Sequence, residues 1–76
     1  MLYEVIEIKK HPTEDYGHDT GITLYRGNNK TRATQVAISK SKNLYEVTMY
    51  GTDDSGVVIH KYFKNGKQTH SQFTNN

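Results

Sequence analysis

The histidines are the side chains of this chain best suited to hold a metal or to move a proton. There are four of them, at His11, His18, His60 and His70. Zinc sites usually contain a close ligand pair, such as two histidines about three to five residues apart. His11 and His18 are spaced more widely than this, and His60 and His70 would supply only two ligands across a hairpin. We therefore expect surface histidines, with no metal site and no cofactor.

The remaining candidates for catalysis are the serines and the paired carboxylates. The chain contains no cysteine, and none of its serines is flanked by the glycines of a strained Gly-x-Ser-x-Gly turn. Adjacent acids occur at 14–15 and 53–54, in segments that have the composition of loops. The glycine-containing segment 51–56 lacks the Lys-Ser or Lys-Thr pair of a phosphate-binding loop. We expect a protein without enzymatic activity.

Length and composition are typical of one small domain spanning residues 1–76. Only 33% of the residues are hydrophobic, but 11% are aromatic, which argues against a disordered chain. The absence of cysteine fits a reducing compartment. Acidic residues interrupt the first apolar run, and no segment approaches the ~20 apolar residues of a membrane span. We expect a soluble cytoplasmic protein that does not contact a membrane.

Residues 28–43 are the one segment with a helical pattern. Ala33, Val36 and Ala37 recur at the spacing that places side chains on one face of a helix. An asparagine at the start of the segment is suited to cap the first turn, because its side chain accepts a bond from a backbone N–H that has no helical partner. A helix this short is marginal on its own, so we expect it to pack on a sheet.

Five further segments have the alternation of β-strands, over residues 2–10, 22–26, 44–50, 57–63 and 68–73. A polar loop at 11–21 separates the first two strands, and residues 74–76 should fray. Asn65-Gly66 predicts a tight hairpin, because both positions accept a positive φ. The order ββαβββ predicts an α+β fold, an antiparallel sheet of about five strands with one helix packed on one face.

The alternation also predicts which side chains face the helix. The expected core residues are Ile6, Ile8, Ile22, Leu24, Val36, Val47, Met49, Ile59 and Phe63. The uncovered face would gather tyrosines, valines and a histidine, namely Tyr3, Tyr25, Tyr50, Tyr62, Val5, Val58 and His60. A slip of one residue in the first strand would exchange its two faces. Because tyrosine is enriched at interfaces, this face predicts a protein partner or a second copy of the chain. The alternative is a sheet face that is simply solvated.

Nucleic-acid binding is a further alternative, in which the tyrosines would stack on bases. The phosphate contacts would come from Lys30, Arg32, Lys61, Lys64 and Lys67. These basic residues are spread over the helix, a hairpin tip and strand ends, and Glu46 shares the tyrosine face. The net charge of +2 is also mild. We therefore favour a protein partner.

Three segments give the chain its resemblance to a known class of proteins. They are Tyr3-Glu-Val-Ile-Glu-Ile, the helix from Thr31 to Lys40, and the hairpin Lys64-Asn-Gly-Lys. In this plan the chain resembles small single-domain proteins encoded by phages and mobile elements, and among them it is similar to anti-CRISPR proteins with one helix on an antiparallel sheet. The likeness covers most of the length, but no family motif matches residue by residue.

The resemblance implies a phage-encoded inhibitor that occupies a surface of a host or defence complex in the host cytoplasm. Such proteins often engage basic grooves through acidic patches. Here the contact would come from the uncovered aromatic face or from two acidic segments, which contain Glu14, Asp15, Asp19, Asp53 and Asp54. A homodimer closed through the open sheet face is the second hypothesis, and a weak nucleic-acid-binding module is the third.

Overall fold

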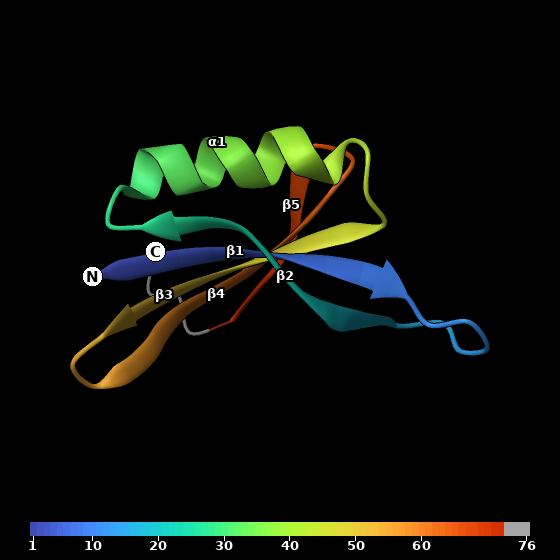
Figure 1. The fold of residues 1–76 in the computed structure, drawn as a ribbon, viewed down its shortest axis with the longest axis horizontal. Helices are drawn as coiled ribbons and strands as arrows, with labels where there is room; N and C mark the ends of the chain where they lie inside the picture. Colours follow the sequence, from blue (N-terminus) through green and yellow to red (C-terminus); the bar gives the residue numbers. More distant parts are fainter. Residues whose placement is uncertain (73–76) are drawn as a thin grey trace.

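The computed structural model describes the backbone of residues 1–72 and the side chains of residues 1–69. Within this part, one helix lies across one face of a five-stranded antiparallel sheet with the order β2-β1-β3-β4-β5 (Figure 1). The elements are β1 (Leu2–Lys10), β2 (Gly17–Gly27), α1 (Lys30–Ser41), β3 (Glu46–Asp53), β4 (Gly56–Lys64) and β5 (Lys67–Gln72). The predicted α+β class and ββαβββ order are confirmed. The end at 74–76, which was expected to fray, lies outside the described residues.

The helix is capped and packed much as its sequence predicts. Asn29 caps α1, because its side-chain Oδ1 accepts a hydrogen bond of 3.0 Å from the backbone N–H of Arg32. The buried face consists of Ala33, Ala37 and Ser41, all fully buried. These small side chains recur every fourth residue and bring the helix close to the sheet.

The register of β1 corrects the predicted faces of that strand. Val5 lies directly opposite Met49 of β3, and both side chains are fully buried in the core beneath α1. Tyr3 joins the same core and is 8% exposed. Ile6 and Ile8 therefore face the other side of the sheet, which reverses the prediction. Apolar side chains on both faces of β1 leave its own alternation ambiguous, and only the pairing with neighbouring strands decides the orientation.

The other strands confirm part of the predicted core. Val47, Met49 and Phe63 are buried beneath the helix, and Leu24, Val36 and Ile59 pack against them. Ile22, in contrast, is 51% exposed, so its predicted place in the core is wrong. It follows Gly21, whose φ is +78°, in a stretch where the β1–β2 register shifts. Such irregularities re-aim the side chains next to them.

Tyr25 is a second correction of the same kind. It lies opposite Val5 and packs against the core, so it belongs to the helix side of the sheet. The Tyr25 ring also lies close to Gly27. A Cβ added at that glycine would be only 2.6 Å from the Tyr25 hydroxyl.

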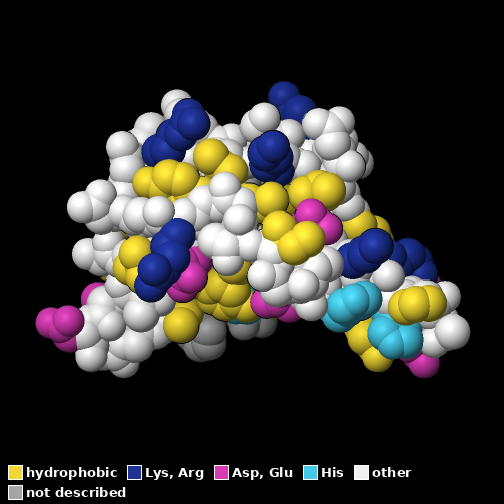
Figure 2. Space-filling view, viewed as in Figure 1, with side chains coloured by type: hydrophobic (Ala, Val, Ile, Leu, Met, Phe, Trp, Pro, Cys, Tyr) yellow, Lys and Arg dark blue, Asp and Glu magenta, His cyan; other side chains and the backbone are white. Residues whose placement is uncertain are grey.

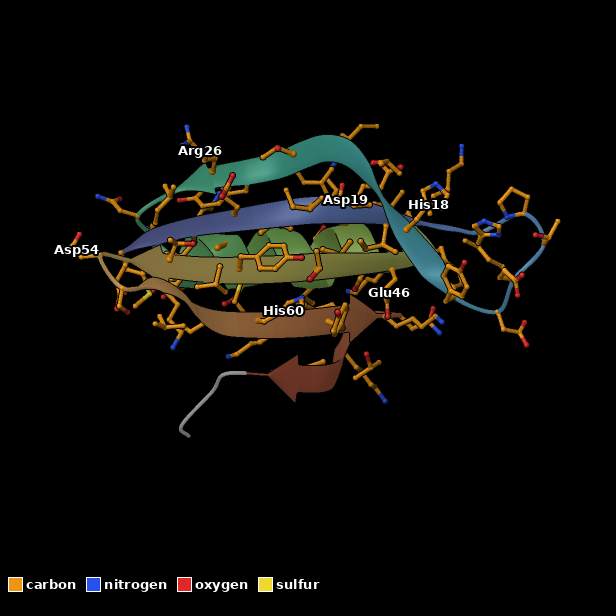
Figure 3. All side chains as sticks on the ribbon, turned by 90° about the horizontal axis from the view of Figure 1, so that it is seen from below. His18, Asp19, Arg26, Glu46, Asp54 and His60 are labelled. Atoms are coloured by element: carbon orange, nitrogen blue, oxygen red, sulfur yellow. The ribbon has the colours of Figure 1, made fainter. Side chains whose placement is uncertain are left out.

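The β1–β2 hairpin is longer and more twisted than predicted. Its loop is 11–16 rather than 11–21, since Gly17 already pairs with Lys10 and begins β2. Two register shifts interrupt the β1–β2 ladder, and such bulges increase twist. As a result, β2 crosses over the far end of β1 on the side away from α1 (Figure 3). Gly17 permits this approach, because any Cβ there would overlap Cγ2 of Ile8.

The β4–β5 turn confirms the predicted Asn-Gly hairpin and fastens the sheet to the helix. Asn65 and Gly66 have φ values of +54° and +78°. The backbone N–H of Asn65 donates to the Ser41 carbonyl at 3.2 Å, and that of Gly66 donates to the Ser41 hydroxyl at 2.8 Å. The same hydroxyl donates to the carbonyl of Ile38 at 2.9 Å. Ser41 therefore joins the end of α1 to the tip of the last hairpin.

Replacing Ser41 by alanine should test this junction. We expect Ser41→Ala to lower the free energy of unfolding by about 1–2 kcal/mol, because a partly buried N–H loses its acceptor. This is a net value, since alanine returns roughly 0.5 kcal/mol through its helix propensity. Urea unfolding measures the change. The control is Ser39→Ala, at an exposed position of the same helix. Equal stability of the two variants would contradict the proposed role of the Ser41 hydroxyl.

Candidate functional site

The side of the sheet away from α1, the open face, is organised in rows of directly paired residues. One row crosses the first four strands through Arg26, Glu4, Tyr50 and His60. The next row runs through Thr23, Ile6, Thr48 and Tyr62. Side chains opposite one another in an antiparallel pair are close enough to interact. The register therefore decides which side chains of this face meet.

Three rings from both rows form one stack, the aromatic ladder of Tyr50, His60 and Tyr62. The ring centroids of Tyr50 and His60 are 4.4 Å apart with the planes at 24°. Those of His60 and Tyr62 are 4.7 Å apart at 45°. All three residues are half-buried. The sequence predicted these residues on the open face, and the structure brings them into direct contact.

The ladder rests on a threonine that sequence reasoning left unassigned. Thr48 is fully buried although it faces away from the helix. Its hydroxyl donates to the Lys61 carbonyl at 3.3 Å, and its Oγ1 lies 3.0 Å from Nε2 of His60. The tautomer of His60 determines which of these two atoms is the donor. This bond holds the middle ring of the ladder in place.

Carboxylates surround the ladder. In the row of Tyr50, Glu4 forms an ion pair of 3.5 Å with Arg26. Glu46 lies on the same face, opposite Ile8. Of the acids predicted to bind a partner, Asp54 lies at the β3–β4 turn, at one end of the sheet, whereas Asp19 lies on β2 opposite Ile8 (Figure 3).

Asp53 and Asp19 each accept hydrogen bonds from residues close to them in the sequence. Asp53 accepts bonds from the Ser55 hydroxyl at 2.6 Å and the Ser55 backbone N–H at 2.8 Å. The two bonds hold the pKa of Asp53 below its usual value, the hydroxyl bond having the larger effect. Asp19 accepts a bond of 2.6 Å from the backbone N–H of Gly21. Glu14 and Asp15 are exposed in the 11–16 loop.

Burial raises the pKa of Tyr62, and the nearby Tyr50 and Glu46 raise it further. A low-dielectric site disfavours the phenolate, and a neighbouring carboxylate repels it. The hydroxyl of Tyr62 is therefore protonated throughout the physiological range of pH.

The predicted phosphate-binding residues do not share one surface. Lys30 and Arg32 belong to α1, and Lys61 lies on the helix side, opposite Met49. Lys64 lies near the open face, with its Nζ 4.1 Å from the ring centroid of Tyr45. Lys67 begins β5. The interleaved basic and aromatic surface that nucleic-acid binding requires is therefore not assembled by these residues.

Charge is instead divided between the two layers. Residues 28–45 contain basic residues and no acid, and Figure 2 shows Lys and Arg gathered over the helix. The chain's acids lie on the sheet and its turns, with Glu4 and Glu46 on the open face. The helix layer is therefore purely basic, whereas the sheet carries both signs of charge, with basic residues on its strands at Lys9, Lys10, Arg26, Lys61, Lys64 and Lys67.

Two of the four tyrosines predicted for the open face are missing from it. Tyr3 and Tyr25 lie on the helix side and contribute to the core. The open face gains Ile6 and Ile8, which are 9% and 8% exposed, in their place. Only the cross-strand register of β1 distinguishes these alternatives, and the sequence of β1 does not encode it unambiguously.

The β1–β2 hairpin also brings together rings that are far apart in sequence. His11 lies 5.1 Å from Tyr16 and 6.0 Å from His18, measured between ring centroids. From their spacing in the sequence, the two histidines were not expected to lie together, but the twisted hairpin brings His18 next to His11. Among the described residues, no three His, Cys, Asp or Glu side chains come together as a metal site.

Comparison with protein-family models, with curated proteins and with solved structures finds no match to this chain. Among the described residues, no helix has the length and apolar character needed to cross a membrane. The argument about function therefore rests on the open face itself.

The ionisation of Tyr62 should report the electrostatics of this face. We expect Tyr62 to ionise above the usual tyrosine pKa of about 10, and Glu46→Gln to lower its pKa because one repelling charge is lost. Part of the shift should persist in that variant, since burial is the larger cause. Because the folded protein retains this proton to higher pH than the unfolded chain, the free energy of unfolding should fall as pH rises through the folded-state pKa.

An NMR titration of tyrosines labelled at Cζ measures the pKa directly. Asp54→Asn removes a charge at the far end of the sheet and should leave the pKa of Tyr62 unchanged. A Tyr62 pKa at or below that of free tyrosine would contradict the described environment.

Proposed function

We propose that the protein is a non-enzymatic binding protein that docks on a larger protein through its open face. The observation that carries this proposal is the aromatic ladder, a stack of rings on the side of the sheet that α1 does not cover. Aromatic side chains dominate the energetics of protein interfaces, and tyrosine buries a large apolar area while its hydroxyl remains able to bond.

The ladder is fixed before any partner arrives. The ring contacts and the bond between Thr48 and His60 restrict the side chains in the free protein. A partner would therefore pay little of the entropy that ordering such side chains costs, about 0.5–1.5 kcal/mol for each. A fixed aromatic patch is the kind of surface around which a binding hot spot forms.

Carboxylates on the open face favour a partner with a basic surface. Glu4 and Glu46 lie on this face, Asp19 lies on β2 opposite Ile8, and Asp54 lies at the β3–β4 turn (Figure 3). The basic helix layer on the opposite side would be repelled by the same partner. Complementary charge of this kind steers the encounter and selects its orientation.

We further propose that the partner is a host or defence complex in the host cytoplasm, for which the protein acts as a phage-encoded inhibitor. The support for this setting is the resemblance in plan to anti-CRISPR proteins, together with carboxylates on the open face that could contact a basic groove. Inhibition of target cleavage by purified CRISPR effector complexes is the direct assay. Wild-type protein should inhibit at least one complex, and a Tyr50→Ser, Tyr62→Ser variant should not. No inhibition by the wild-type protein would contradict the inhibitor proposal, and equal inhibition by the variant would contradict docking through the ladder.

Site-specific photocrosslinking should locate the docking surface in cells. A photoreactive phenylalanine analogue at Tyr50 should crosslink to one defined protein, because that ring would lie at the interface. The matched control carries the analogue at Thr31, which is exposed on α1. Crosslinking should also decline at higher ionic strength, because surface charges are screened.

Three outcomes would contradict the proposal. The first is crosslinking at Thr31 but not at Tyr50. The second is crosslinking of Tyr50 to a second copy of the chain, which would favour the homodimer. The third is crosslinking to nucleic acid, which would favour the remaining alternative.

A further inference from the structure

A hollow of about 450 Å³ lies beside the aromatic ladder, where the twisted β1–β2 hairpin approaches the start of β3. We propose that this hollow, the hairpin pocket, receives an arginine side chain of the partner protein. The inference rests on the proposed docking function and specifies its chemistry. The pocket is lined by Asp15, Tyr16, Gly17, Tyr45, Glu46, Tyr62 and Lys64.

The pocket combines aromatic rings with carboxylates, which is the combination that a guanidinium group prefers. Tyr16 is 57% exposed, and Tyr45 is half-buried. Asp15 and Glu46 supply two negative charges against the single ammonium of Lys64. Guanidinium stacks on aromatic faces and forms paired bonds with carboxylates, so both kinds of lining residue would be used.

The chain's own lysine shows that this lining attracts a cation. Nζ of Lys64 lies 4.1 Å from the ring centroid of Tyr45, within the range of a cation–π contact. In the part of the chain that the structure describes, the only ion pair joins Arg26 to Glu4. Asp15 and Glu46 therefore form no ion pair with Lys64. The pocket retains net negative charge next to rings that already attract a positive group.

The pocket exists because of the twisted hairpin. Gly17 places the hairpin against Ile8 and Tyr45, since a Cβ at this glycine would overlap Ile8 and lie 3.0 Å from the ring of Tyr45. The return of the hairpin brings Asp15 and Tyr16 to the side of the sheet where Glu46 and the ladder lie. An arginine in the pocket would therefore be adjacent to the docking face.

Titration with N-acetyl-L-arginine amide, followed by ¹⁵N NMR of the full chain, tests this proposal without the partner. The uncharged analogue N-acetyl-L-citrulline amide has nearly the same shape and is the control ligand. We expect saturable shifts at the amides of Tyr16, Gly17 and Glu46 with the arginine compound. The citrulline compound should bind about tenfold more weakly, because it lacks one charge-assisted contact.

Two variants sharpen the result. Glu46→Gln should weaken the arginine compound by at least about threefold, whereas Asp54→Asn, at the opposite end of the sheet, should change nothing. Lys64→Gln should strengthen binding by about twofold or more, because it removes a competing cation from the Tyr45 ring. The N-acetyl-L-lysine amide should bind more weakly than the arginine compound.

Equal binding of arginine and citrulline compounds, shifts away from the pocket, or weaker binding in Lys64→Gln would each overturn the inference. Tighter binding of the lysine compound would overturn the preference for arginine. These results are independent of the docking proposal. If the pocket binds arginine but Tyr50 crosslinks to no protein, the pocket stands and docking through the ladder fails. If Tyr50 crosslinks to a partner but arginine does not bind, the reverse holds.

Discussion

The close packing of α1 on the sheet is the contact on which the rest of the structure depends. Ala33, Ala37 and Ser41 present only small side chains, so the helix lies near enough for Tyr3 and Val5 to complete the core beneath it. The Ser41 hydroxyl then joins the end of the helix to the β4–β5 turn. A domain this small buries only roughly 60% of its unfolded surface. The junction is therefore important for stability, because it joins the end of the helix to the last hairpin. Because the helix packs on one face of the sheet, the opposite face remains uncovered by it and can bind a partner.

The second constraint is the irregular β1–β2 ladder. Two shifts in register twist the hairpin so that β2 crosses the open face. This crossing helps to bury Ile8, whose Cγ2 lies where a Cβ of Gly17 would be. The same twist forms the hairpin pocket and brings His11 and His18 together. An ideal, flat hairpin of the same length would have left a plain sheet face with no hollow in it.

Much of the fold was predictable from local signals. The asparagine cap, the alanines of the helix and the Asn65-Gly66 turn each have a local physical cause, and each was confirmed. The faces of β1 were not predictable, because Val5 and Ile6 are both apolar and both are buried, on opposite sides. Their assignment depends on pairing with β3, which is a long-range property.

The candidate site was likewise predictable only in part. Alternation placed Tyr50, His60 and Tyr62 on the open face correctly, because β4 and the start of β3 have a clear pattern. The buried Thr48 beneath them has no local signal, because it is buried only by neighbours on other strands. The hairpin pocket was also beyond sequence reasoning, since it depends on bulges that bring 11–17 next to residues 45–46 and 62.

The helix covers Tyr3, Val5 and Met49, and the aromatic ladder occupies the opposite face. Nuclear Overhauser effects between assigned side chains can verify this arrangement. We expect contacts from the methyl groups of Ala33 and Ala37 to the core cluster of Tyr3, Val5 and Met49, and contacts of His60 ring protons with both Tyr50 and Tyr62. Contacts from Ala37 to Ile6 or to Tyr50 would contradict it, because they would place the proposed docking face beneath the helix.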